Sequence, residues 1–269
     1  MRATRYISAI LCAVTLGAAT QTVSAESQPV AKPDFVLAID AGHGGDDKGC
    51  NSGTNYEKNI TLDVAKRFQT LVEKACGDSV KVVMTRKTDV FVPLGDRARI
   101  ANEAQADLFV SIHVNSIDKR SKGRHLVHGA SVYTVGLHKS EANLKVAMRE
   151  NAVIELEEDF SETYQGFDPN SSESYIIFEL GQNRNMHQSI AFADMAQQEL
   201  INTAGRADKG VRQAGFLVLW ATKMPAVLVE LDFICNTEAA RFLASEKGRQ
   251  KCAQALFNAF KTYRMNKSI

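Results

Sequence analysis

Residues 35–45 read FVLAIDAGHGG, an apolar run that passes directly into a glycine-rich turn. The run from Phe35 to Ile39 has the length and composition of a buried strand. Glycine-rich backbone immediately after such a strand is typical of a tight turn or of a close approach to a ligand. The stretch therefore predicts a buried strand that ends at a binding site.

Apolar strands and amphipathic helices alternate along the rest of the chain. Strands are predicted at 80–84, 107–112, 130–135, 216–220 and 226–229, and helices at 60–75, 94–106, 141–152, 189–203, 238–244 and 249–263. This alternation favours an α/β fold, with a mostly parallel or mixed sheet that carries helices on both faces. A chain of 269 residues, 45% of them hydrophobic, suits one such domain or at most two small ones. With a net charge of +1, nothing in the composition suggests the clustered basic surface that a nucleic-acid footprint needs, so no nucleic-acid partner is expected.

Residues 1–25 have the pattern of a secretory signal peptide. Arg2 and Arg5 supply a positive start, an apolar run follows, and Val23-Ser24-Ala25 offers a small-residue cleavage site. The apolar run is shorter than the roughly 20 residues that span a membrane. The residues before Cys12 lack the small side chains of a lipoprotein signal. We expect an exported protein of the periplasm or the extracellular cell wall, without a transmembrane span in the mature chain.

Residues 26–33 (ESQPVAKP) form a polar linker, and residues 34–264 form the predicted domain. Export permits disulfides, and four cysteines follow the signal, namely Cys50, Cys76, Cys235 and Cys252. They allow three complete pairings, among which the sequence cannot choose. Because they form no CxxC pair, a cysteine-only zinc site is not favoured, and burial as free thiols is the default interpretation.

Three polar residues, His43, His113 and Glu230, each stand just beyond an apolar run. A carboxylate at such a place is costly unless it is paired, hydrogen-bonded or near a metal. In open α/β sheets, ligands bind beyond the carboxyl ends of the strands. If the three strands are parallel, these residues converge on one crevice, which is the predicted site.

Glu57, at the start of the helix 60–75, supplies a fourth element. Two imidazoles and one carboxylate are a ligand set of catalytic zinc, which leaves a fourth position for water. Zinc brings the pKa of that water toward roughly 7. A nearby carboxylate that does not bind the metal, Glu230, could then transfer the proton.

Each of these residues also has a purely structural interpretation. The two histidines could be a turn residue and a hydrogen-bonded core residue. Glu57 could serve the helix dipole, and Glu230 could be the buried partner of Arg86 or Arg97. The occurrence of all four together favours the metal site.

Other polar residues near these motifs receive lesser roles. Asp40 and Asn115 are expected to orient the ligands. His125 and His128 follow a Lys/Arg-rich stretch, so they are expected to be solvated.

Together these motifs resemble the type 3 zinc N-acetylmuramoyl-L-alanine amidases. The resemblance covers roughly residues 34–264 and keeps the order of the family's motifs, which are Asp40-Ala-Gly-His43-Gly-Gly, Glu57-Lys58, Thr85-Arg86, Ser111-Ile-His113-Val-Asn115, Glu150-Asn151 and Leu228-Val-Glu230-Leu-Asp-Phe-Ile-Cys-Asn236. Any one motif alone is weak, whereas the set is specific. One departure is Asp232, where the family commonly has glycine.

The resemblance implies a single α/β domain with a twisted six-stranded sheet. It implies that His43, Glu57 and His113 ligate Zn²⁺ and that Glu230 is the catalytic carboxylate. The implied reaction is hydrolysis of the amide between N-acetylmuramic acid and L-alanine in peptidoglycan, with a role in daughter-cell separation. Two alternatives stay open, namely an inactive peptidoglycan-binding scaffold and a zinc peptidase that acts on the stem peptide.

Residues 153–186 form an acidic insert that interrupts the alternation. It is either a solvated surface segment or a regulatory one, because in some relatives an insert here lays a glutamate on the zinc. We hypothesise that Glu157 or Glu158 is that occluding carboxylate, that residues 175–180 dock the segment, and that an activator protein relieves the block.

Overall fold

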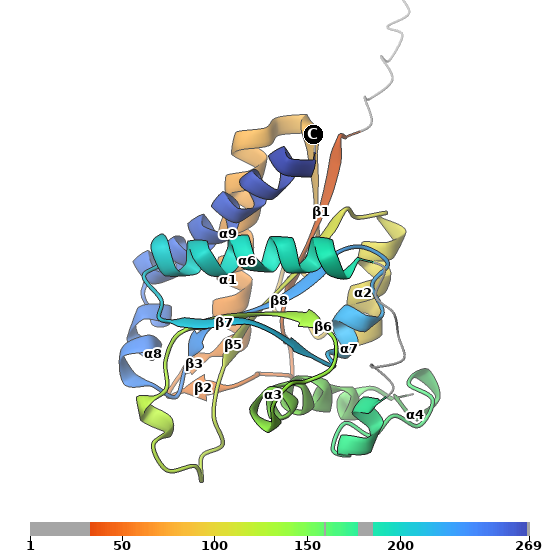
Figure 1. Ribbon diagram of the computed structural model, residues 1–269, viewed down its shortest axis with the longest axis vertical. Coiled ribbons are helices and arrows are strands. Elements are labelled where there is room, and N and C mark those ends of the chain that lie inside the picture. The colour runs from red at the N-terminus through yellow and green to blue at the C-terminus, as the bar shows by residue number, and fades with distance from the viewer. Residues whose placement is uncertain (1–32, 159, 177–184, 268–269) are drawn as a thin grey trace, which may run out of the picture. The chain divides into compact units, whose positions relative to one another are not determined.

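The computed structural model describes residues 33–158, 160–176 and 185–267. The predicted signal peptide, almost all of the linker and part of the predicted docking segment 175–180 lie outside these residues. The core of the domain is a six-stranded sheet in the order β4-β1-β5-β8-β6-β7 (Figure 1). Its strands are β1 (Phe35–Ala41), β4 (Val80–Met84), β5 (Leu108–Asn115), β6 (Ala130–Val135), β7 (Asp208–Ala214) and β8 (Ala226–Phe233).

The sheet is mixed, as predicted. The four strands β4, β1, β5 and β8 are mutually parallel, and β6 pairs with β8 in the antiparallel direction while β7 lies parallel to β6. The implied six-stranded α/β fold is confirmed. A two-stranded hairpin of β2 (Asn51–Ser52) and β3 (Asn55–Tyr56) precedes the first helix.

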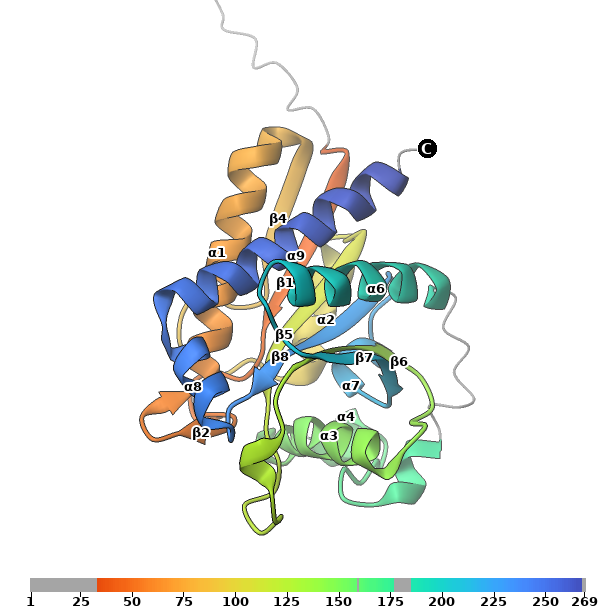
Figure 2. The ribbon, with the colours of Figure 1, turned by 60° about the vertical axis from the view of Figure 1, so that its left-hand side comes forward.

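Helices cover both faces of the sheet (Figure 2). One face packs against α1 (Glu57–Cys76), α6 (Met186–Asn202), α8 (Thr237–Ala244) and α9 (Glu246–Lys267). The other packs against α2 (Leu94–Glu103), α3 (Glu141–Asn151) and α7 (Leu217–Trp220). In β1, Leu37 and Ile39 join the first core whereas Val36 and Ala38 join the second. Burial of both faces explains why the inner strands read as unbroken apolar runs.

The predicted strand at 216–220 is wrong. Leu217–Trp220 is the short helix α7. The strand of this region is β7, which ends at Ala214, before the predicted strand begins, and is polar in sequence (DKGVRQA). β7 lies at the edge of the sheet and is only half-buried over most of its length, so its sequence carries no apolar run. The apolar side chains of α7 pack into the second core, where a helical turn buries them as well as a strand would.

Several elements extend beyond their predicted bounds. The helix predicted from residue 60 begins at Glu57, and the strands predicted to end at 112 and 229 continue through His113 and Glu230. Glu57, His113 and Glu230 therefore belong to regular elements, whereas His43 lies in the turn that follows β1. The four cysteines are free thiols as expected, but only Cys235 and Cys252 are buried, whereas Cys50 and Cys76 are partly exposed. Among the described helices, none combines the length and the apolarity needed to cross a membrane.

Candidate metal centre and active site

The site is built at the carboxyl ends of three neighbouring parallel strands, β1, β5 and β8. His43 follows two residues after β1, and His113 in β5 lies opposite Glu230 in β8 in the strand register. All three side chains are buried. The predicted convergence of the three strand ends is confirmed.

Four side chains meet at one point beside these strand ends. Their ligand atoms lie within 4.8 Å of one another, and the residues are His43, Glu57, His113 and Glu150. Glu57 Oε1 lies 3.0 Å from His43 Nε2 and 3.3 Å from His113 Nδ1. Glu150 Oε2 lies 3.3 and 3.1 Å from the same two nitrogens. The structure thus brings the three predicted ligands together and adds a fourth.

This cluster fits a metal ion. His43 Nε2, His113 Nδ1 and Glu150 Oε2 are buried without a hydrogen-bond partner in the described structure, an arrangement that is costly unless something else satisfies them. Around a tetrahedral zinc with ligands at roughly 2.0–2.1 Å, neighbouring ligand atoms lie about 3.3 Å apart. The four separations of 3.0–3.3 Å match that spacing.

The charges of the cluster also call for a cation. Burial lowers the pKa of His113, but the charge of Glu150 and the contacts with the Glu150 and Glu57 carboxylates together outweigh burial and raise that pKa to about 9. The pKa of His43 is raised as well, against its burial, by the charge of Glu57. Without metal, the carboxylates hold protons on the imidazoles. A metal ion requires neutral imidazoles, so it would replace these protons with its own charge.

The turn that carries His43 is held by close packing. His43 has a left-handed backbone, with φ of 61°, and its Nδ1 lies 2.7 Å from Asp47 Oδ2. A Cβ on Gly42 would lie 2.4 Å from His113 Nε2, so only glycine fits there. Asp47 fixes the orientation of the His43 ring and leaves Nε2 facing the cluster. The sequence interpretation missed Asp47, although it stands four residues after His43 in the same turn.

Glu57 is held in place by backbone donors. Its Oε1 accepts a hydrogen bond from Val114 N at 2.7 Å, and its Oε2 accepts one from Cys50 N at 2.9 Å. Burial raises the pKa of Glu57, but the charge of His43 and the contacts with both histidines together outweigh burial, so the pKa lies below its usual range. Glu57 is therefore an ionised carboxylate aimed at the histidines, and its place in α1 is more than a response to the helix dipole.

Glu230 is fully buried and does not belong to the four-residue cluster. Burial, reinforced by the charge of Glu150, raises its pKa to about 8. Its Oε1 lies 3.4 Å from Arg149 Nη2, and its Oε2 has no hydrogen-bond partner among the described residues. The alternative partners considered from sequence, Arg86 and Arg97, instead donate to the backbone carbonyls of residues 41–43.

Arg149 connects the two carboxylates of the site. Its Nη2 lies 2.6 Å from Glu150 Oε1 besides its contact with Glu230, and its Nη1 donates to Ser116 O at 2.6 Å. Asn115 Oδ1 accepts from the same guanidinium at 3.2 Å. The expected role of Asn115 is thus corrected, because it supports Arg149 rather than a histidine ligand.

The expected role of Asp40 is corrected too. Its carboxylate is fully buried and accepts hydrogen bonds from three side chains, at 2.8 Å from Arg97, 2.6 Å from Ser111 and 2.6 Å from Thr85. Arg97 also donates to His43 O at 2.9 Å. Asp40 and Arg97 therefore hold the backbone of the turn and contact no imidazole by a hydrogen bond.

The carboxylate beside the histidines is Glu150, and the choice of Glu157 or Glu158 is wrong. Glu150 lies in the last turn of α3, before the insert begins. Glu157 Oε1 accepts from Leu94 N at 2.9 Å at the start of α2, and Glu158 is exposed and outside the cluster. The acidic composition of the insert suggested an occluding residue there. The carboxylate at the cluster instead belongs to the Glu150-Asn151 motif, just before the insert.

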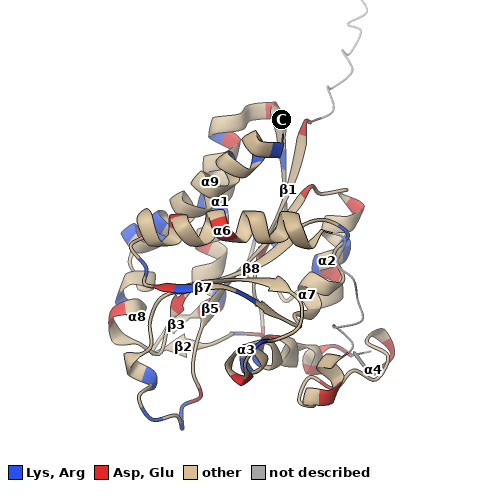
Figure 3. Cartoon of the chain, viewed as in Figure 1, with Lys and Arg blue, Asp and Glu red and all other residues tan. Residues whose placement is uncertain are grey.

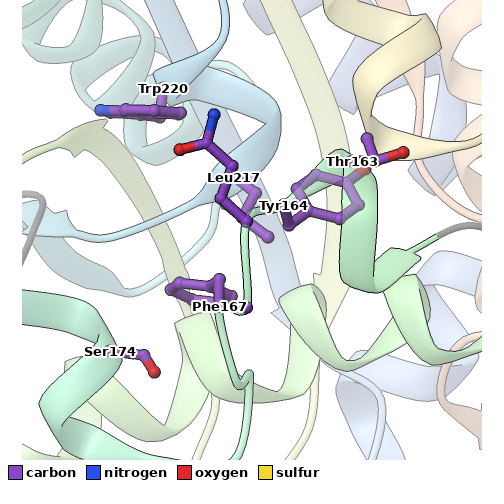
Figure 4. Close-up of a pocket in the computed structure, with 8 residues that line it drawn as sticks. Thr163, Tyr164, Phe167, Ser174, Leu217 and Trp220 are labelled. Atoms are coloured by element: carbon purple, nitrogen blue, oxygen red, sulfur yellow. The ribbon is translucent and has the colours of Figure 1, made fainter.

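The remaining candidates lie apart from the metal cluster. His125 and His128 are exposed as expected, and His125 Nδ1 contacts Cys235 O at 2.6 Å. Asp232 is buried, accepts from Gly129 N at 2.6 Å and pairs with Arg206 at 2.7 Å, so it ties β8 to neighbouring loops. A pocket of about 320 Å³ lies between the insert and α7 (Figure 4) and shares no residue with the cluster.

Comparison with known proteins places this geometry in a family. The sequence profile of the N-acetylmuramoyl-L-alanine amidases matches residues 37–262. N-acetylmuramoyl-L-alanine amidase AmiC of Escherichia coli O6:H1 is 32% identical over 239 residues, which cover 85% of this chain and 52% of AmiC. AmiA of Escherichia coli K12 is 28% identical, over 96% of this chain and 90% of AmiA. The chain thus spans about half the length of AmiC and most of AmiA.

Solved structures agree with this fold. The catalytic domain of CwlV, an N-acetylmuramoyl-L-alanine amidase from Bacillus (Paenibacillus) polymyxa var. colistinus, superposes with a TM-score of 0.62 at 26% identity and covers 86% of this chain and 98% of that one. AmiC2 of Nostoc punctiforme gives 0.63 at 25% identity, with 87% and 99% covered. Since the family profile spans most of the sequence and the fold agrees, the chain belongs to the N-acetylmuramoyl-L-alanine amidase family.

Proposed function

We propose that this protein is a zinc-dependent hydrolase that cleaves the amide between the lactyl group of N-acetylmuramic acid and L-alanine in peptidoglycan. The observation that carries the proposal is the meeting of two imidazoles and a pinned carboxylate at the ends of parallel strands, beside a separate buried carboxylate. His43, Glu57 and His113 are assigned as the metal ligands, and Glu230 as the proton-transferring group.

The residues of the site divide the chemistry among them. A bound zinc supplies a Lewis acid and brings the pKa of water toward roughly 7. Glu230 accepts the proton of the attacking water and passes it to the leaving amine of L-alanine. A pKa raised by burial suits this task, because a general base works best when its pKa lies near the operating pH. Asp47 keeps the ring of His43 in the tautomer that presents Nε2.

We assign the described arrangement to a resting form. Glu150 Oε2 lies beside both histidines, where it would exclude a substrate or water from a bound metal, and Arg149 of the same helix lies 3.4 Å from Glu230. Activity then requires α3 to move, and an activator protein that displaces α3 is the partner implied. Glu150→Gln should raise basal turnover, because it weakens the occluding contact while leaving the other three ligands in place. Unchanged or lower turnover in a folded variant would argue against occlusion.

Digestion of purified peptidoglycan, with and without chelator and beside a Glu230→Gln variant, tests the reaction. Mass spectrometry should find free glycan strands and intact stem peptides only with the metal-loaded wild type. Shortened stem peptides would indicate a peptidase, and no products under any condition would indicate a binding scaffold. All four proposed residues are present, which favours the enzyme. Cleavage that continues in the presence of the chelator, or in the Glu230→Gln variant, would contradict the mechanism.

We further propose that residues 1–25 direct export, that residues 26–33 form a linker, and that residues 34–264 act in the periplasm or cell wall during daughter-cell separation. The signal-like N-terminus and the family's substrate support this assignment. N-terminal sequencing of the protein recovered from the cell envelope should begin at Glu26. Recovery of the uncleaved chain in the cytoplasmic fraction would contradict export.

A further inference from the structure

We propose that a cationic cavity beside the metal cluster binds the carboxylates of the stem peptide. The cavity has a volume of about 830 Å³ and lies between α3, β7 and the loop that joins β5 to β6. This inference rests on the proposed function and deepens it, because it assigns a recognition site for the peptide side of the scissile amide.

The lining of this cavity carries an excess of positive charge. Its lining holds five cationic side chains, Arg120, Lys145, Arg149, Lys209 and Arg212, against one carboxylate, Asp118. The whole chain, by contrast, carries a net charge of only +1. Positions of Lys and Arg, coloured blue on the ribbon, occur on α3, on β7 and on the loop between β5 and β6 (Figure 3). A concave surface with this excess of one sign concentrates anionic ligands.

Two of these cations have no carboxylate partner in the described part of the chain. Arg120 pairs with Asp118, Lys145 pairs with Glu141, and Arg149 pairs with the carboxylates of the site. By contrast, no ion pair of Lys209 or Arg212 occurs among the described residues. These two side chains therefore supply the charge that a ligand would neutralise.

The Arg212 guanidinium is held in a fixed direction. Its Nε donates to Lys209 O at 2.8 Å, and its Nη1 donates to Asn143 Oδ1 at 3.0 Å. Neither acceptor carries a charge, so the positive charge remains uncompensated. An arginine oriented in this way can present its remaining N–H groups to a carboxylate.

The rest of the lining is apolar and selects the kind of anion. Val127, Tyr133, Val146, Met148 and Phe233 contribute to the wall. Such a wall suits a peptide that carries methyl and methylene groups together with carboxylates. It offers little to a sugar-phosphate polymer, which would leave the apolar side chains without contacts. A short acidic peptide is the ligand class that fits both parts of the wall.

The cavity is continuous with the proposed reaction centre. Asn115 and Arg149 line it, and Arg149 lies 3.4 Å from Glu230. A peptide in the cavity therefore extends away from the point where its N-terminal amide would be cut. Lys209 and Arg212 lie on β7 in the sheet, so their backbone does not depend on the position of α3, whereas Asn143, which orients the Arg212 side chain, moves with that helix.

The test compares two muropeptides that differ in one group, a tetrapeptide-bearing muropeptide with the D-glutamate α-carboxylate free and the same compound with that group amidated. Arg212→Gln and Lys209→Gln should each lower kcat/KM on the acidic compound by about tenfold, the size of a lost charge-assisted hydrogen bond. The amidated compound should lose less. Arg99→Gln, which removes the same charge from an exposed site on α2, is the matched control and should change neither.

Binding separates this inference from the proposed reaction. Calorimetric titration of the free acidic tetrapeptide into Glu230→Gln protein needs no turnover, and it should show binding that Arg212→Gln in the same background weakens by about tenfold. If the enzyme is active but all variants keep the wild-type preference and affinity, the cavity assignment is wrong while the amidase assignment stands. If no substrate is cleaved yet the peptide binds and Arg212→Gln weakens it, the cavity assignment stands without the reaction.

Discussion

Two clusters of buried polar groups lie a few residues apart in this molecule, and they differ in how fully their groups are satisfied. In the first, Asp40 receives three hydrogen bonds from side chains, and Arg97 donates to Asp40 and to backbone carbonyls with both of its terminal nitrogens and Nε. In the second, two imidazole nitrogens and a carboxylate oxygen face one another without a hydrogen bond. A satisfied buried network stabilises the fold, whereas an unsatisfied one marks a place that awaits a ligand.

The largest effect is expected from a substitution that disrupts the satisfied cluster around Asp40 and Arg97. Arg97→Met leaves the Asp40 carboxylate buried without its counter-ion, so the free energy of unfolding should fall by about 3–5 kcal/mol. Chemical denaturation of metal-free protein measures it. Arg99→Met, on an exposed position of the same helix, should leave the unfolding midpoint where it is. Equal midpoints for Arg97→Met and wild type would remove the contrast between the two clusters.

The next largest effect is expected when a metal ion binds to the unsatisfied cluster. Zinc should stabilise the wild type by about 2.7 kcal/mol when its free concentration is a hundred times the Kd, because it binds the folded chain alone. Thermal melts at rising zinc concentration measure this shift. A His113→Ala variant, which lacks one proposed ligand, should show a much smaller shift. If both proteins respond equally, the metal binds elsewhere.

A smaller effect concerns the group that orients a ligand. Asp47→Asn should weaken zinc affinity by about 10–100-fold, since partners of ligating histidines typically contribute that much. Competition with a chromogenic chelator measures the affinity. Asp46→Asn, at the neighbouring exposed position, is the matched control. An unchanged affinity in Asp47→Asn would mean that the turn alone orients His43.

The smallest effect separates the insert from the site. Glu158→Gln should leave basal amidase activity and zinc affinity unchanged, because Glu158 is exposed and outside the cluster. Parallel assays with Glu150→Gln supply the comparison. Activation by Glu158→Gln, and none by Glu150→Gln, would restore the original choice of occluding residue.

Sequence reasoning reached most of the fold because the inner strands are buried on both faces. The apolar runs that begin near Phe35, Leu108 and Ala226 are typical of buried strands, and the structure buries all three. β7 escaped prediction because an edge strand needs few apolar residues, and the apolar α7 was mistaken for it.

The site residues at the strand ends could be predicted from the sequence. The site residues that depend on how α3 packs against the sheet could not. His43, His113 and Glu230 follow from their positions after apolar runs. Glu150 and Arg149 reach the site only because α3 packs across the crevice, and local sequence does not encode that packing. Asp47 is intermediate, because its role depends on a turn conformation in which His43 has a positive φ.

Arg149 and Glu150 are consecutive residues of one helix, and this adjacency couples two events. A rigid displacement of α3 withdraws the counter-ion of Glu230 and uncovers the histidine pair in the same motion. If α3 moves as a rigid unit, the contact of Arg149 with Glu230 and the contact of Glu150 with the histidines break together. No state then exists in which the histidines are open to substrate while Arg149 still pairs with Glu230. Background hydrolysis would then report the fraction of molecules in which α3 is fully detached, and graded stimulation would change that fraction rather than the rate of each open molecule.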